Sequence, residues 1–142
     1  MKKILIIALL GLLAVSCSKD QSAVKKLTGR WILVSTTTIN EDNGTENTDP
    51  ASETITSEIE FDNCKLAKDE FCTVTFILND EFYGLALYTV SGDGIILEMF
   101  DSKYEDAFGT SEIIELTDTD CKIQEEDENN SSIKYISNYQ KV

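Results

Sequence analysis

Histidine is absent from this 142-residue sequence, which removes the commonest general base and metal ligand of enzymes. Without it, neither a Ser-His nor a Cys-His nucleophile arrangement can form. The sequence also lacks a glycine-rich phosphate loop and a CxxC pair. No spacing of carboxylates singles out a pair for glycoside hydrolysis. We therefore expect a protein that is not an enzyme and that uses no cofactor.

Basic residues are scarce, with 12 Lys and Arg against 26 Asp and Glu, for a formal net charge of -14. Such a charge argues against nucleic-acid partners and against direct adhesion to anionic lipid headgroups. The acidic, oxygen-rich stretches 40–49 and 125–129 could in principle ligate Ca²⁺, but neither has EF-hand spacing. A run of charge is usually a solvated turn, so no metal site is expected.

Long apolar runs are also missing, apart from the dozen or so residues from Ile4 to Val15. That run is too short to cross a bilayer, which takes about 20 residues. With Lys2 and Lys3 before it and small residues after it, the segment 1–16 is typical of a signal peptide.

The end of this segment, Ala14-Val15-Ser16-Cys17, resembles a bacterial lipobox. The resemblance implies cleavage before Cys17 and its diacylation, with palmitate as a typical acyl chain. The alternative is an ordinary secretory signal with a cysteine by chance. Acylation would attach the protein to the membrane through its N-terminal acyl chains. Ser18 and Lys19-Asp20 resemble the outer-membrane and surface-export tags of some Gram-negative lipoproteins, which implies an outer-membrane lipoprotein of the cell envelope. Residues 17–26 are polar and are interpreted as the lipidated tether. Whether the protein would face the periplasm or the cell surface stays open.

Helical periodicity is lacking after the signal segment, and what recurs instead is a run of β-prone residues followed by a polar turn. The run 53–62 is the cleanest, with Ile55, Ile59 and Phe61 on one side and polar residues on the other. The segment 40–52 holds the only proline and is expected to be an exposed loop. Eight runs are found, at 29–39, 53–62, 70–79, 82–90, 94–100, 110–117, 120–126 and 131–140.

Short turns such as Ser-Gly-Asp-Gly at 91–94 link these runs and favour hairpins between neighbours. The residues 27–142 are therefore expected to form one all-β domain, an eight-stranded antiparallel meander closing into a β-barrel. A β-sandwich is the competing fold.

Cysteines besides Cys17 number three: Cys64, Cys72 and Cys121. In an oxidising envelope, Cys64 and Cys72 could form a local disulfide and leave one buried thiol. Three buried, unreactive thiols are an equally good interpretation.

The single tryptophan lies in "LTGRWILVS", residues 27–35, which resembles the G-x-W first strand of bacterial lipocalin-like lipoproteins. The stretches 62–71, 87–99 and 111–123 and the closing "YQKV" are similar to further blocks of the same family. The resemblance implies a lipocalin-like β-barrel with no catalytic residues. It also implies that Trp31 closes one end and stacks on a basic residue, Lys141 or else Arg30. Gly29 would let the chain turn in tightly before Trp31.

An eight-stranded barrel is either filled by side chains or holds one small ligand. The resemblance favours a small apolar ligand, bound in or at the mouth of the barrel. A non-enzymatic protein-interaction module with a filled barrel, contacting another envelope protein, is the alternative. Tyr104 and Phe108, in the connector 101–110, are candidates for a ligand or partner loop. A monomer is expected, and neither the ligand nor the partner can be identified from the sequence.

Overall fold

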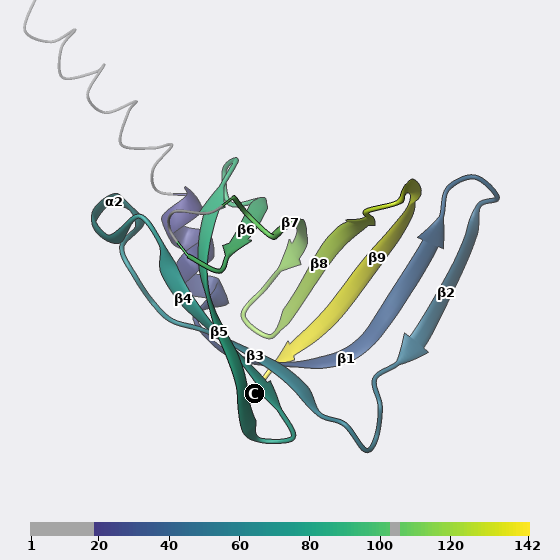
Figure 1. The fold of residues 1–142 in the computed structure, drawn as a ribbon, viewed down its shortest axis with the longest axis horizontal. Helices are drawn as coiled ribbons and strands as arrows, with labels where there is room; N and C mark the ends of the chain where they lie inside the picture. Colours follow the sequence, from purple (N-terminus) through teal and green to yellow (C-terminus); the bar gives the residue numbers. More distant parts are fainter. Residues whose placement is uncertain (1–18, 103–105) are drawn as a thin grey trace, which may run out of the picture.

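The computed structural model describes residues 19–102 and 106–142 of the chain. The expected signal peptide, Cys17 and Tyr104 lie outside these described residues. The described part contains nine β-strands and two short helical segments, residues 19–27 and α2 (Figure 1). The bounds are β1 (Gly29–Asn40), β2 (Thr45–Pro50), β3 (Ser57–Phe61), α2 (Leu66–Asp69), β4 (Cys72–Leu78), β5 (Glu81–Ser91), β6 (Ile96–Phe100), β7 (Gly109–Leu116), β8 (Asp120–Asp127) and β9 (Asn130–Lys141).

The strands form a closed antiparallel barrel of eight strands with one extra strand, β2. From β3 to β9 each strand pairs with the next in sequence, and β9 pairs back onto β1 to close the barrel. β3 pairs with residues 29–32 of β1, and β2 pairs with residues 35–40 along the same edge. β2 and β3 are thus two pieces of one broken strand. The predicted eight-stranded barrel is confirmed.

The expected loop 40–52 is not entirely a loop, because it contains β2. Its threonines suit an extended chain, and Thr48 and Thr37 of β1 share a hydrogen bond of 2.9 Å between their hydroxyls. Pro50 is the last residue of β2, on a strand that has no second partner among the described residues, so its missing N–H disrupts no ladder. The prediction of exposure holds, since every residue of β2 is exposed.

The expected tether 17–26 is also not entirely a tether. Residues 19–27 are helical, and Val24 and Leu27 are completely buried, with Ala23 nearly so. We call residues 19–27 the plug helix. Nine residues with only three apolar positions are too few to show a helical period, and the helix is held by packing rather than by its own propensity. Residues 19–26 therefore belong to the folded part that the structure describes, upstream of the expected boundary at Leu27.

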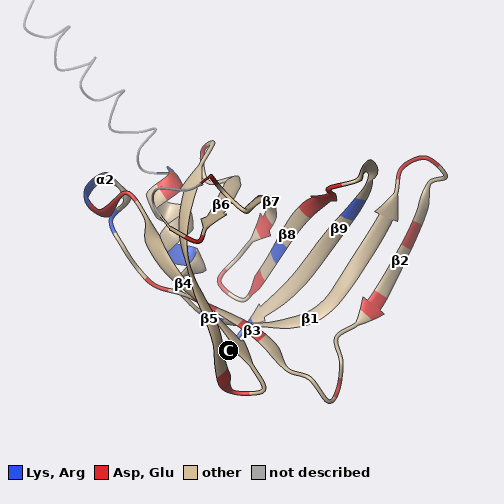
Figure 2. Cartoon of the chain, in the orientation of Figure 1, with Lys and Arg blue, Asp and Glu red and all other residues tan. Residues whose placement is uncertain are grey.

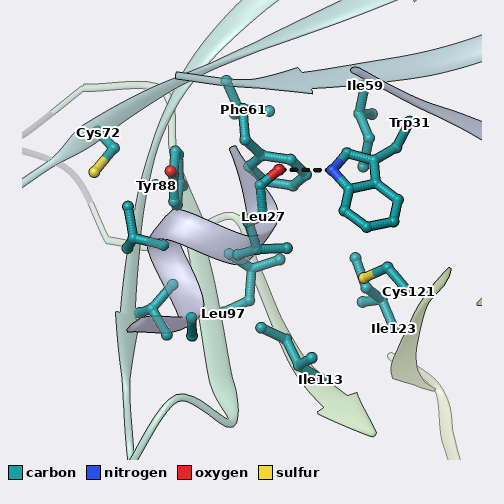
Figure 3. Packing of buried hydrophobic residues seen from close by; sticks show 14 of the residues in the cluster. Leu27, Trp31, Ile59, Phe61, Cys72, Tyr88, Leu97, Ile113, Cys121 and Ile123 are labelled. Carbon is teal, nitrogen blue, oxygen red and sulfur yellow. Dashed lines mark hydrogen bonds between the residues drawn. The ribbon is translucent and has the colours of Figure 1, made fainter. Parts of the chain in front are cut away.

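The core lies where the plug helix meets the inner face of the barrel (Figure 3). Trp31 and Leu97 are completely buried there, and Phe61 packs edge-on against Tyr88 with ring centroids 5.0 Å apart. The Tyr88 hydroxyl donates to the carbonyl of Asp62 at 2.8 Å, so its burial leaves no unsatisfied donor. Among the described residues, no helix is both long and apolar enough to span a membrane.

Candidate functional site

The plug helix closes one end of the barrel through contacts with two connecting segments. Asp20 accepts a hydrogen bond from the N–H of Gly94 at 2.6 Å, in the turn between β5 and β6. Gln21 donates to the carbonyl of Cys64 at 2.8 Å and accepts from the N–H of Leu66 at 3.0 Å. These contacts fix both the turn and the segment before α2 onto the helix.

Trp31 joins the plug helix to the first strand. Its indole N–H donates to the carbonyl of Leu27 at 2.6 Å (Figure 3). Lys141 Nζ lies 5.0 Å from the ring centroid. Lys141 also donates to the carbonyl of Lys26 at 3.1 Å. Of the two bases expected near the ring, Lys141 is the one in contact, whereas Arg30 pairs with Glu58 and Asp80. Trp31 is therefore part of the buried core at the plug end of the barrel.

Gly29 allows this closure by its backbone and by its lack of a side chain. Its φ of 114° is one that L-residues rarely adopt, and a Cβ there would lie 3.1 Å from Lys141 Cε.

The cysteines take the first of the two predicted arrangements. Cys64 and Cys72 form a disulfide that ties the segment before α2 to β4, and Cys121 is a free, buried cysteine. Burial, with a smaller effect of Glu115, raises the pKa of the Cys121 thiol to about 12, so the thiol is protonated and unreactive at neutral pH.

A pocket of about 510 Å³ lies toward the other end of the barrel, over β6 to β9. Side chains alternate along β8, so Glu125 lies on the same inward face as the buried Ile123, two residues nearer the open end. Glu125 pairs across the strands with Tyr135 of β9. One wall of the pocket is apolar and the other is acidic. It is lined by Met99, Phe108, Gly109, Thr110, Ser111, Glu125, Glu126, Asp127, Glu128, Asn129 and Tyr135. We call it the mouth pocket.

Hydrogen bonds hold the polar wall of the mouth pocket in place. The buried Ser111 donates to Glu125 at 2.9 Å, and the Tyr135 hydroxyl donates to Asp127 at 3.1 Å. Asp127 also accepts the N–H groups of Asn129 and Asn130 at 2.9 and 3.0 Å. These bonds, first that from Asn129 and then that from Tyr135, lower the pKa of Asp127. The bond to Asp127 in turn raises the pKa of Tyr135, which stays a neutral donor.

Only part of this pocket was predicted from the sequence. Phe108 lines it, as expected for a loop at the mouth. Glu125, Asp127 and Tyr135 were missed, since 125–129 reads as a solvated acidic turn. The alternation of β8 could have revealed Glu125, which follows Cys121 and Ile123 at spacings of two.

Another hollow, of about 430 Å³, lies on β3 and the hairpin of β4 and β5. Its lining is mostly apolar and includes Phe76, Leu78 and Tyr83. In the part of the chain that the structure describes, no three His, Cys, Asp or Glu side chains come together in a way that could hold a metal ion.

Comparison of the chain with protein-family models, with curated proteins and with solved structures returns no match.

Proposed function

We propose that this protein is a lipid-anchored, lipocalin-like protein of the cell envelope that binds a small ligand in the mouth pocket. The observation that carries the proposal is a cavity of about 510 Å³ toward the end of the barrel opposite the buried core at the plug helix. Small-molecule sites are typically concave, about 300–1,000 Å³ in volume, and combine apolar walls with a few fixed polar groups. The mouth pocket has this combination.

The lining restricts the chemistry of the ligand. Met99 and Phe108 offer apolar contact, and Met adapts readily to different shapes. Glu125 and Asp127 face the same space, and carboxylates there disfavour an anionic ligand such as a fatty acid. The ligand is therefore an apolar molecule whose polar end is neutral or cationic.

Titration of the purified protein with dodecylamine and with dodecanoate, followed by calorimetry, tests this proposal. We expect dodecylamine to bind at least tenfold more tightly than dodecanoate. Gly109→Leu places a side chain in the pocket, and a Cβ there meets no atom within 4 Å, so the variant should fold yet lose most of this affinity. Gly84→Leu, whose Cβ is equally free and lies outside the pocket, is the matched control and should bind as the parent does.

Equal affinity of the parent and Gly109→Leu for dodecylamine would contradict binding in the mouth pocket. Absence of binding by either amphiphile, together with no small molecule on the purified protein in native mass spectrometry, would contradict ligand binding altogether.

A protein-interaction role is the second candidate, because the exposed side of the β4–β5 hairpin carries several large apolar side chains. The two roles use different parts of the molecule and can be tested separately.

A further inference from the structure

Half of β5 has an unpaired edge. β4 pairs with one edge of β5 from Glu81 to Tyr88, but β6 reaches the other edge only at Leu87 and beyond. No described residue pairs with residues 81–86 on that second side. We call residues 81–86 the free edge. In Figure 1 the β4–β5 hairpin projects at the bottom of the view, away from β6.

The free edge is unusually apolar for an exposed strand. Phe82 is 70% exposed, Tyr83 75% and Leu85 58%. Natural sheets commonly protect such edges with lysine, proline or a covering loop, and a long apolar edge left open is a template for pairing. An exposed cluster of large apolar residues marks an interaction site.

The hairpin is held in place rather than left loose. Arg30 of β1 pairs with Glu58 and bonds Asp80 at 2.8 Å, which ties the β4–β5 turn to the body of the barrel. Asn79 in the same turn bonds Thr56 twice, through its N–H and through its side-chain oxygen, each at 2.9 Å. Apart from the register shift at Tyr83, the edge is already extended and fixed, so a partner has little ordering cost on binding.

The surroundings of the free edge are acidic. Asp80 and Glu81 stand at the tip of the hairpin, and from Asp69 to Asp101, both included, the sequence holds seven acidic residues and no Lys or Arg. Figure 2 shows β4 and β5 without basic residues and with acidic ones at the hairpin tip. Arg30, which bonds Asp80 in the hairpin turn, is already paired with two carboxylates. A partner with basic residues would therefore be attracted, and a second copy of this acidic chain would be repelled.

The exposed apolar area of the free edge fits a single added strand. Aromatic side chains bury about 150–250 Å² each when covered, so two rings and a leucine at these exposures offer roughly 400 Å². A stable interface between folded proteins needs about 800 Å² from each side. The patch is thus large enough for one added strand and too small for a folded partner alone.

We infer that the free edge of β5 binds an extended segment of another protein, with alternating apolar residues flanked by lysine or arginine, as an added antiparallel strand. The main-chain groups of residues 81–86 would supply the hydrogen bonds, and Phe82, Tyr83 and Leu85 would supply the apolar contacts.

Selection of random ten-residue peptides displayed on phage against the purified protein tests this inference. We expect enriched sequences with alternating apolar residues and basic ends, and protection of the amides of residues 82–86 from hydrogen exchange when such a peptide is bound. Leu85→Lys should weaken the peptide at least tenfold. Ile114→Lys, which changes an apolar residue 42% exposed on β7, is the matched control and should leave binding unchanged. Thermal unfolding of both variants verifies that they are folded.

Selected peptides that bind Leu85→Lys as well as the parent, that protect other amides or that lack basic residues would overturn the inference. Failure to enrich any peptide would do the same. A dimer seen by sedimentation that disappears in Leu85→Lys would assign the edge to a second copy and would also overturn it. Gly109→Leu should keep peptide binding, so that this result is separate from that of the mouth pocket.

Discussion

At the scale of single residues, the side chain of Trp31 makes three kinds of structural contact. It fills the plug end, bonds the last residue of the plug helix and lies beside Lys141 of the closing strand. The G-x-W pattern therefore marks a structural position at the end of the barrel opposite the mouth pocket. Lys141 has a compact, strongly hydrated charge, so its cation–π contact contributes less than an arginine would.

Trp31→Ala is expected to lower the free energy of unfolding by about 3–5 kcal/mol, as large core truncations do. Trp31→Phe keeps most of the apolar volume and loses the indole N–H, so it should cost less. Urea unfolding followed by circular dichroism measures both changes. A loss below about 1 kcal/mol for Trp31→Ala would contradict its role as the plug of the barrel.

Asp127 is expected to make stability depend on acid pH. Its pKa is lowered in the folded protein, so its contribution is complete above the unfolded pKa of about 3.9 and is lost as the pH falls through the folded value. The difference in free energy of unfolding between the parent and Asp127→Asn should therefore narrow as the pH falls from 6 to below 3. Tyr135→Phe removes one of its donors and should give an intermediate profile. A constant difference at every pH, measured by urea unfolding, would contradict this.

At the scale of elements, the strands could be predicted because their signals are local. Apolar and polar residues alternate along β3. In the turn after β5, Gly92 and Gly94 adopt positive φ angles, which glycine tolerates without steric cost. Seven strands match the predicted runs to within a few residues, while β3 covers only 57–61 of the run 53–62. The elements that were missed depend on distant contacts. β2 is a strand because β1 offers it an edge, and the plug helix is helical because the barrel buries Val24 and Leu27.

The candidate site was harder to predict for the same reason. Phe108 could be found as an aromatic residue in a connector. The acidic wall of the mouth pocket requires knowing that β7, β8 and β9 lie side by side with Ser111, Glu125 and Tyr135 facing one space. Sequence alone does not distinguish these carboxylates from those of any solvated turn.

Gly94→Ala tests how tightly the plug helix is packed. A Cβ at Gly94 would lie 3.1 Å from Ala23 Cβ and 3.2 Å from the Lys19 carbonyl, at a φ of +86°. Gly44 also has a positive φ, +67°, but a Cβ there meets no atom within 4 Å. Gly44→Ala therefore reports backbone strain alone, about 1 kcal/mol. Gly94→Ala should cost about 1–3 kcal/mol more, as overpacking does. If thermal or urea unfolding showed equal losses of stability for Gly94→Ala and Gly44→Ala, the plug helix would be able to shift away from the added methyl group without cost.

At the scale of the whole molecule, the two ends of the barrel differ in kind. The plug end is packed and cross-linked by a disulfide, and it holds the buried Trp31, Phe61 and Tyr88. The opposite end is open, with acidic side chains around the mouth pocket. The free edge of β5 lies apart from both, on a hairpin that the barrel holds in place. The fold thus separates a structural end from two surfaces that remain accessible.

The plug helix has a consequence for how the barrel would stand on a membrane. It begins at or before Lys19, two residues after Cys17, and two residues of extended chain span at most about 7 Å. If Cys17 carries acyl chains, the protein has no long linker between its lipid anchor and the plug helix. Its plugged end would rest against the headgroups, and its mouth would point into the aqueous space. A ligand of the mouth pocket would then enter and leave through water. The bilayer would support the barrel without supplying its ligand.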